Sequence, residues 1–171
     1  MSRVGKRGAG DGVLQVEVTH NDLGDLVAAI NKHGTPKEVK KELRRALREA
    51  VKPLVPKARA SVLGQGSKGK GGKLPSLRGD MARSVEVKVD LGGRTPGVRL
   101  RLNGRKLRGR PPGLVAMYEG TVPWRHPVFG TSAWASQAHR GFLTEVGRAG
   151  EPQVMTDVEK AMDDIGKKID G

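Results

Sequence analysis

Residues 85–102 read VEVKVDLGGRTPGVRLRL, and this stretch decides the fold. Valines alternate with charged residues over 85–90, and valine and leucine alternate with Arg99 and Arg101 over 98–102. A period of two is typical of a strand with one buried face. The glycine- and proline-containing turn between the two runs predicts an antiparallel hairpin, with Arg99 and Arg101 on its exposed face.

Two amphipathic helices are predicted to pack against this sheet. Apolar residues recur at steps of three and four between residues 39 and 58, which indicates a long helix after Pro36. Pro53 and Pro56 remove backbone donors, so we expect this helix to bend near residues 49–53. A closing helix is predicted over residues 151–169, with Pro152 in its first turn.

The remaining elements are shorter, and the chain is expected to form one domain of the α+β class. Strands are predicted over residues 14–19 and 113–120, and a helix over residues 21–32. The expected architecture is a small antiparallel sheet packed against a long kinked helix and a C-terminal helix, with long basic glycine-rich loops. We expect residues 1–12 to be a flexible basic arm, residues 13–171 to be the domain, and residues 64–78 to be a mobile loop within it.

The charge of the chain bears on its partners. A formal net charge of +14 makes nucleic acid or another polyanionic surface the default partner. Pairing of this charge with acidic faces of neighbouring subunits is the alternative. No apolar run approaches the length of a membrane-spanning helix, so we expect no membrane partner and a soluble protein made in a cytoplasm.

Groups that could carry catalysis or hold a metal are few. The chain has no cysteine, and its four histidines show no metal-ligand spacing. Gly64, Gly69 and Lys70 come close to a phosphate-binding loop, but Gly71 stands where a serine or threonine would reach magnesium. We therefore expect no enzymatic activity, no metal and no cofactor.

Aromatic residues gather in one short stretch, VPWRHPVFGTSAW at residues 122–134. Trp124, Phe129 and Trp134 are three of only five Phe, Trp and Tyr residues in the chain. Proline and glycine at this density exclude a helix interior or a central strand, so the aromatic residues are expected on a loop or a broken sheet edge. Large apolar side chains held in such a segment usually dock against another surface.

The order of these parts resembles the gene-product-ten-like family of tailed bacteriophages, which are small neck or tail-completion proteins of long-tailed virions. The resemblance covers about residues 36–168. It includes the HPVFG run with a following tryptophan. In contrast, the long lysine-rich loop of this chain departs from the commoner family pattern. The other residues that carry it lie in a segment after the glycine-rich loop and in a tyrosine–glutamate–glycine triplet: Leu77, Met81, Ser84, Tyr118, Glu119 and Gly120.

The resemblance implies a structural virion protein that forms a hexameric ring at the head–tail junction and contributes to the DNA channel. Its neighbours would be a head-completion or adaptor ring and a tail terminator or tail tube, and the protein would be made in the host cytoplasm and reside in the virion neck. The alternative is a basic nucleic-acid-binding protein of the ribosomal or nucleoid-associated kind.

In a ring each subunit offers two different patches to its neighbours. Aromatic anchors suit such patches, although packing on the small core is the alternative for Trp134. Residues predicted at a subunit or ring-to-ring interface are Trp124, His126, Pro127, Phe129 and Trp134. Residues predicted to dock on partner rings or to contact DNA are Lys68, Lys70, Lys73, Arg99, Arg101, Arg105, Lys106, Arg108 and Arg110.

Overall fold

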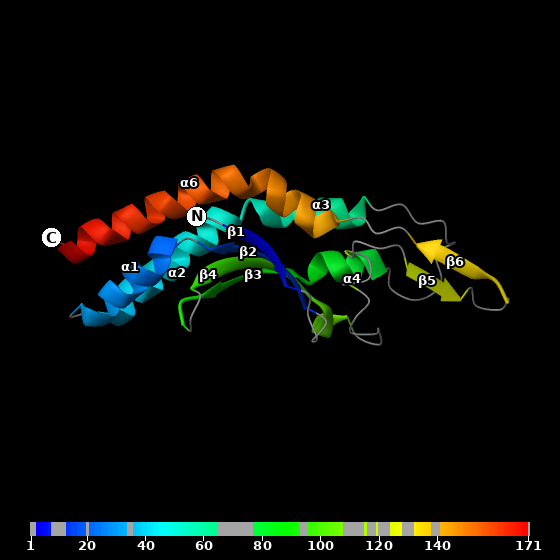
Figure 1. Cartoon of the computed structure of the whole chain (residues 1–171), viewed down its shortest axis with the longest axis horizontal. Helices are drawn as coiled ribbons and strands as arrows, with labels where there is room; N and C mark the ends of the chain where they lie inside the picture. The colour runs from blue at the N-terminus through cyan, green and yellow to red at the C-terminus, as the bar shows by residue number, and fades with distance from the viewer. Residues whose placement is uncertain are drawn as a thin grey trace.

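A four-stranded antiparallel sheet with helices on one of its faces makes up the body of the molecule (Figure 1). The computed structural model describes residues 3–7, 13–19, 21–33, 36–64, 77–92, 96–107, 115, 119, 124–127, 132–137 and 141–170. The chain is of the α+β class, and its small antiparallel sheet packs against a kinked helix pair and a long C-terminal helix, as the sequence predicts.

The sheet has the strand order β1-β2-β4-β3. The predicted hairpin is confirmed: β3 (Val85–Asp90) pairs with β4 (Gly97–Asn103), with Val85 opposite Leu102 and Val89 opposite Val98. The predicted strand β2 (Val13–Thr19) pairs with the other side of β4. Strand β4 is therefore central, and its residues Val98, Leu100 and Leu102 are buried.

The prediction of a flexible arm at residues 1–12 is wrong for residues 3–7. These residues form β1 (Arg3–Arg7), which pairs antiparallel with β2 and adds an edge strand to the sheet. Backbone groups on an unpaired strand edge are ready to bond with another segment, whatever its side chains. The composition of the arm gives no sign of this pairing, because the hydrogen bonds come from the backbone.

The predicted bend in the long helix is confirmed. Helix α2 (Pro36–Val51) ends at a turn through Lys52 and Pro53, and α3 (Leu54–Leu63) continues the chain. The Lys52 N–H still donates to the Arg48 carbonyl at 3.0 Å. Since Pro53 has no N–H to continue the ladder, the helix restarts in a new direction.

Helix α6 (Phe142–Asp170) is longer than predicted, and Pro152 lies inside it rather than in its first turn. The N-terminus of α6 is held by Glu119, whose carboxylate accepts hydrogen bonds from the N–H groups of Leu143 (3.1 Å) and Thr144 (2.6 Å). Such a cap satisfies donors that have no partner within the helix. The distant cap explains why the local sequence did not reveal the true helix start.

The predicted strand over residues 113–120 is also wrong at the two positions that the structure describes. Val115 and Glu119 are both helical, and both are buried. A short apolar run fits a buried strand and a buried helix equally well, so the sequence pattern did not distinguish them.

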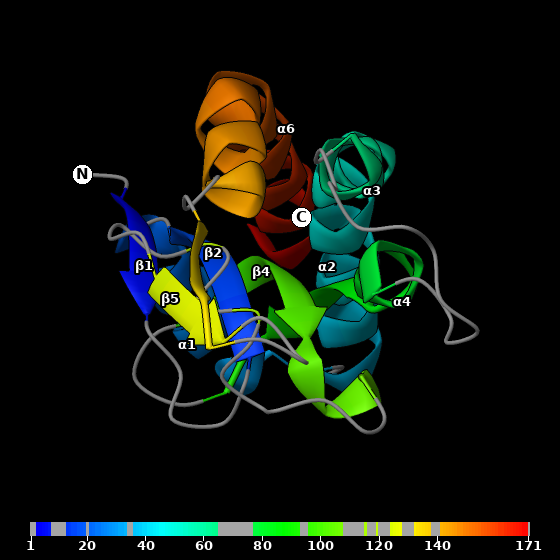
Figure 2. The same cartoon turned by 90° about the vertical axis from the view of Figure 1, so that its right-hand side faces the viewer.

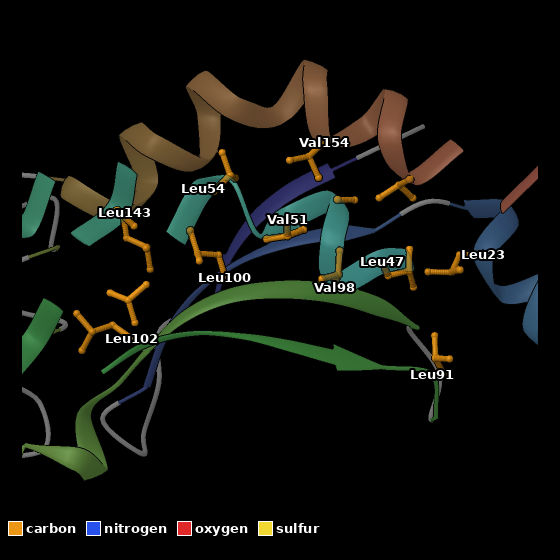
Figure 3. Close-up of a cluster of buried hydrophobic side chains, with 14 of the residues drawn as sticks. Leu23, Leu47, Val51, Leu54, Leu91, Val98, Leu100, Leu102, Leu143 and Val154 are labelled. Atoms are coloured by element: carbon orange, nitrogen blue, oxygen red, sulfur yellow. The ribbon is translucent and has the colours of Figure 1, made fainter. Parts of the chain in front are cut away.

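The core lies between the sheet and the helices (Figure 3). Helix α2 contributes Leu43 and Leu47, α1 (Asn21–Lys32) contributes Leu23 and Ile30, and α4 (Leu77–Arg83) contributes Met81. Helices α3 and α6 approach closely at Gly150, where an added Cβ would lie 2.3 Å from the Leu54 Cδ2 atom. The short 3-10 helix η1 (Gly104–Lys106) follows β4.

Candidate interaction surfaces

The tryptophan-rich segment forms a separate hairpin. Strands β5 (Trp124–Pro127) and β6 (Trp134–Gln137) pair antiparallel, with Pro127 opposite Trp134. This hairpin lies at the end of the molecule opposite the C-terminus (Figure 1). With two strands, both strands are edges, which agrees with the broken edge expected from the prolines and the glycine.

The side chain of Trp134 is 58% exposed. Its described neighbours in the hairpin, Arg125, Ser132, Ala133 and Ser136, are exposed as well, and Ala135 is half-buried. The alternative that Trp134 packs on the core is therefore wrong for the single chain. A two-stranded hairpin with so little burial gains little stability from its own side chains.

Several predicted site residues cannot be compared with the structure. Phe129, Lys68, Lys70, Lys73, Arg108 and Arg110 lie outside the described residues, as do residues 65–76 of the predicted mobile loop. For Trp124, His126 and Pro127, the structure describes the strand that contains them and their pairing partners. The interface roles expected for these residues stay predictions.

The arginines of β4 are tied into the sheet rather than presented on an open surface. The Arg99 side chain is 13% exposed and lies 3.5 Å from the Asp90 carboxylate. The Arg101 side chain is 23% exposed, and its Nε donates to Glu86 at 2.7 Å. The prediction that Arg99 and Arg101 line an exposed face is therefore wrong, because carboxylates of the neighbouring strand β3 hold both.

Lys106 shares the same carboxylate. Its Nζ lies 2.5 Å from Glu86 Oε2. Burial raises the pKa of Glu86, but the hydrogen bonds from Lys106 and Arg101 outweigh this, and the pKa lies below its usual value. Of the four described basic residues in this predicted set, Arg105 is exposed on η1 and Lys106 is exposed but engaged.

A second basic surface lies on α2 and consists of Lys37, Lys41, Arg44 and Arg48, which we call the basic stripe. Their spacing of four, three and four residues places them on one helix face. All four side chains are exposed, and none forms a salt bridge within the described part of the chain. None of the four was among the predicted contact residues, although their spacing is visible in the sequence.

The basic side chains of α2 affect the carboxylates on the same helix. The pKa of Glu49 is lowered, first by the hydrogen bond from Lys52 and also by the charges of Arg45 and Arg48. Glu42, on the side facing α6, pairs with Lys168. The engaged carboxylates of α2 thus lie beside the basic stripe, and its four cations remain exposed.

A groove between α1 and α6 has the opposite charge. Asp22, Glu159 and Asp163 line it, with Leu26 and Met162 as apolar members and Lys167 as a basic member. We call it the acidic groove. It was not predicted, because it forms only where two helices distant in the sequence lie side by side.

Residues that carry the family resemblance have structural roles here. Ser84 is buried, and its Oγ donates to the Met81 carbonyl at 2.8 Å, while the buried Met81 anchors α4. Glu119 of the tyrosine–glutamate–glycine triplet is 1% exposed and caps α6. Ser84, Met81 and Glu119 therefore position elements of the fold.

Among the described residues, no group of three or more His, Cys, Asp or Glu side chains could hold a metal ion. No helix in the same part of the chain is long and apolar enough to cross a membrane. Comparison of the chain with protein-family models, with curated proteins and with solved structures finds no match.

Proposed function

We propose that this chain is a structural subunit of a tailed bacteriophage virion, which assembles as a hexameric ring at the head–tail junction and takes part in tail completion. The observation that carries the proposal is the exposed Trp134 on a hairpin that stands apart from the main sheet. The subunit has no catalytic role and no cofactor. It is made in the host cytoplasm and resides in the virion neck.

A ring subunit needs surfaces that are exposed alone and covered in the assembly. Tryptophan suits such a surface, because it buries a large area while few rotatable bonds are fixed. The pairing of Pro127 with Trp134 gives the anchor a defined backbone. The hairpin therefore contacts an adjacent subunit or the next ring, with Trp124, His126 and Phe129 in the same contact.

The basic residues fall into two groups, those paired within the chain and those exposed to partners. Arg99, Arg101 and Lys106 pair with two carboxylates within the chain, those of Asp90 and Glu86, and stabilise the sheet. Exposed Arg105 and the lysines and arginines of the loops dock on acidic partner rings. A strongly adhesive channel would slow the passage of DNA, because each neutralised phosphate adds affinity through released counterions.

The test measures mass and incorporation. We expect the purified chain to reach a ring-sized mass by light scattering, alone or after it joins virion precursors assembled without it. Trp134→Ala should reduce incorporation at least tenfold, because a buried aromatic anchor contributes about 2 kcal/mol or more to an interface. Trp134→Phe should retain most of it. Leu63→Ala is the matched control, since Leu63 is a comparably exposed apolar side chain on α3.

A chain that stays monomeric and ignores these precursors would overturn the proposal. The second candidate is a nucleic-acid-binding protein, which the basic stripe of α2 favours, since four cations on one helix face can contact successive phosphates. Titration with a random-sequence duplex at several salt concentrations separates the two functions. Tight binding with a steep salt dependence, together with no incorporation, would favour the second candidate.

A further inference from the structure

Strand β3 forms one edge of the four-stranded sheet. Figure 2 shows β1, β2 and β4 side by side from left to right, and β3 lies beyond β4 because it pairs with the side of β4 that β2 leaves free. No described strand pairs with the outer side of β3. Backbone groups along this edge can therefore bond with another strand.

The hydrogen bonds to β4 decide which backbone groups of β3 point outward. The Asn103 N–H donates to the Ser84 carbonyl at 3.1 Å, one position beyond the pairing of Val85 with Leu102. In an antiparallel pair, residues that exchange hydrogen bonds alternate with residues that do not. Alternate residues from Glu86 onward therefore bond to β4. The residues whose N–H and C=O groups point away from β4 are Val85, Val87 and Val89.

Most of these outward groups have no partner within the described part of the chain. The Val85 carbonyl accepts a hydrogen bond from Arg59 Nη2 at 3.4 Å. The outward groups of Val87 and Val89 form no hydrogen bond with any described residue. The side chains of Val87 and Val89 pack against the core and are only partly buried, as expected at a sheet edge. Core packing thus fixes the strand, while its outer donors and acceptors stay unused among the described residues.

The charges on β3 are complementary to those of a second β3. When two copies pair antiparallel about Val87, this valine lies opposite its own counterpart, and Glu86 lies opposite Lys88 of the second copy. Lys88 is exposed and has no ion pair within the described residues. Opposite charges on facing residues stabilise a strand pair, whereas like charges destabilise it. Registers centred on Glu86 or on Lys88 would place like charges opposite each other.

We propose that the free chain forms a two-fold dimer through β3, in which two four-stranded sheets join into one continuous sheet. Pairing about Val87 sets the outward groups of Val85 against those of Val89, and each facing pair exchanges two hydrogen bonds. A carbonyl has two lone pairs, so the bond from Arg59 to Val85 is compatible with the dimer. The contact is isologous and closes with two copies. It goes beyond the proposed ring function and does not rest on it.

The first test removes one outward donor and keeps the hairpin. Val87→Pro deletes an N–H that β4 does not use, and proline is tolerated at such a position on an edge strand. Sedimentation equilibrium of the full chain should show dimerisation at least tenfold weaker than for the wild type. Val87→Ala is the matched control, because it shortens the same side chain and retains the N–H. It should dimerise to within about threefold of the wild type.

The second test reverses the charge of Lys88. Lys88→Glu places a glutamate opposite Glu86 of the second copy and should weaken dimerisation at least fivefold. Lys57→Glu makes the same change of charge at an exposed site on α3 and should not weaken it. Each variant lowers the formal net charge from +14 to +12, so general repulsion alone predicts tighter association of both. An equimolar mixture of Lys88→Glu with Glu86→Lys should recover dimerisation, because opposite charges again face each other.

Amide hydrogen exchange identifies the surface that the dimer uses. In the monomer, the N–H groups of Glu86 and Lys88 bond to β4 and are protected, while those of Val87 and Val89 exchange quickly. Raising the protein concentration should slow exchange at the two valines at least tenfold and change exchange at Glu86 and Lys88 little. Thermal unfolding of each variant checks that the fold is intact.

Three results would overturn the dimer: a wild type that stays monomeric up to about 0.5 mM, a Val87→Pro variant that dimerises as the wild type does, or valine amides whose exchange does not depend on concentration. Species larger than a dimer that Val87→Pro abolishes would assign this edge to β1 of a second copy and would also contradict the two-fold contact.

Failure of this inference is distinct from failure of the ring function. Trp134→Ala should leave the dimer intact, because the hairpin takes no part in it. A wild type that dimerises through β3 but never joins virion precursors would keep the dimer and remove the ring function. A monomeric wild type that joins them would do the opposite.

Discussion

The helix–sheet body and the β5–β6 hairpin of this chain differ in how far their side chains are buried. In the body, Leu47, Leu102 and Leu143 are fully buried between α2, β4 and α6. In the hairpin, no described side chain is buried, and Trp134 is exposed. Since buried apolar area supplies most of the folding free energy, the body is the stable unit, and the hairpin is available for contact with a partner.

The largest expected effect on stability comes from truncating a buried side chain in the body. Leu102→Ala removes a fully buried side chain near the end of the central strand β4 and leaves a cavity in the core. We expect the free energy of unfolding to fall by about 2–5 kcal/mol, measured by urea denaturation. A loss below about 1 kcal/mol would mean that the body is packed no better than the hairpin.

The cap of α6 is expected to have the next largest effect. Glu119→Ala leaves the N–H groups of Leu143 and Thr144 without their carboxylate, in a buried site. We expect a loss of about 1–3 kcal/mol in the free energy of unfolding. Glu119→Gln retains one acceptor oxygen and should lose less. Equal stability of all three proteins would contradict a role of Glu119 in positioning α6.

Close packing between α3 and α6 can be tested at Gly150. Gly150→Ala improves helix propensity by about 1 kcal/mol, but its Cβ would meet Leu54 Cδ2. We expect a net loss of about 1–2 kcal/mol, and no loss when Leu54→Ala is already present. Gly166→Ala in the same helix is the control, since no atom lies within 4 Å of the added Cβ. Independent effects of the two changes would refute the contact.

The ion pairs of the sheet are expected to contribute less. The pKa of Glu86 is lowered in the folded chain, so the carboxylate stabilises the fold above its unfolded pKa, near the ordinary value of 4.5, and this stability is lost as the pH falls through the folded pKa. Glu86→Gln should therefore cost about 1 kcal/mol at pH 7 and progressively less below pH 4.5. A difference that stays constant from pH 7 to pH 3 would contradict this assignment.

The smallest effect on stability is expected in the hairpin. Trp134→Ala should change the free energy of unfolding by no more than about 0.5 kcal/mol, because the side chain is exposed. The same change should strongly reduce incorporation into virion precursors. A large loss of stability in the isolated chain would instead assign Trp134 to the fold and would remove the comparison between body and hairpin.

Sequence periodicity predicted much of the body correctly. The alternation at 85–90 and 98–102, the helical spacing after Pro36 and the break at Pro53 all appear in the structure. Each of these signals is local, because it depends on side chains a few residues apart. The start of α6 and the pairing of β1 were mispredicted, since one depends on Glu119 and the other on a strand edge.

The sequence by itself determined the α+β class, the sheet-forming hairpin, the bent helix and the unusual concentration of tryptophan in one segment. Only the tertiary structure decided which charged side chains are paired within the sheet and which are exposed on the surface. It neutralised Arg99 and Arg101 with carboxylates of the next strand and left the basic stripe of α2 open. It also brought α1 and α6 together to form the acidic groove. Charge pairing depends on distances across the fold, and sequence spacing does not record those distances.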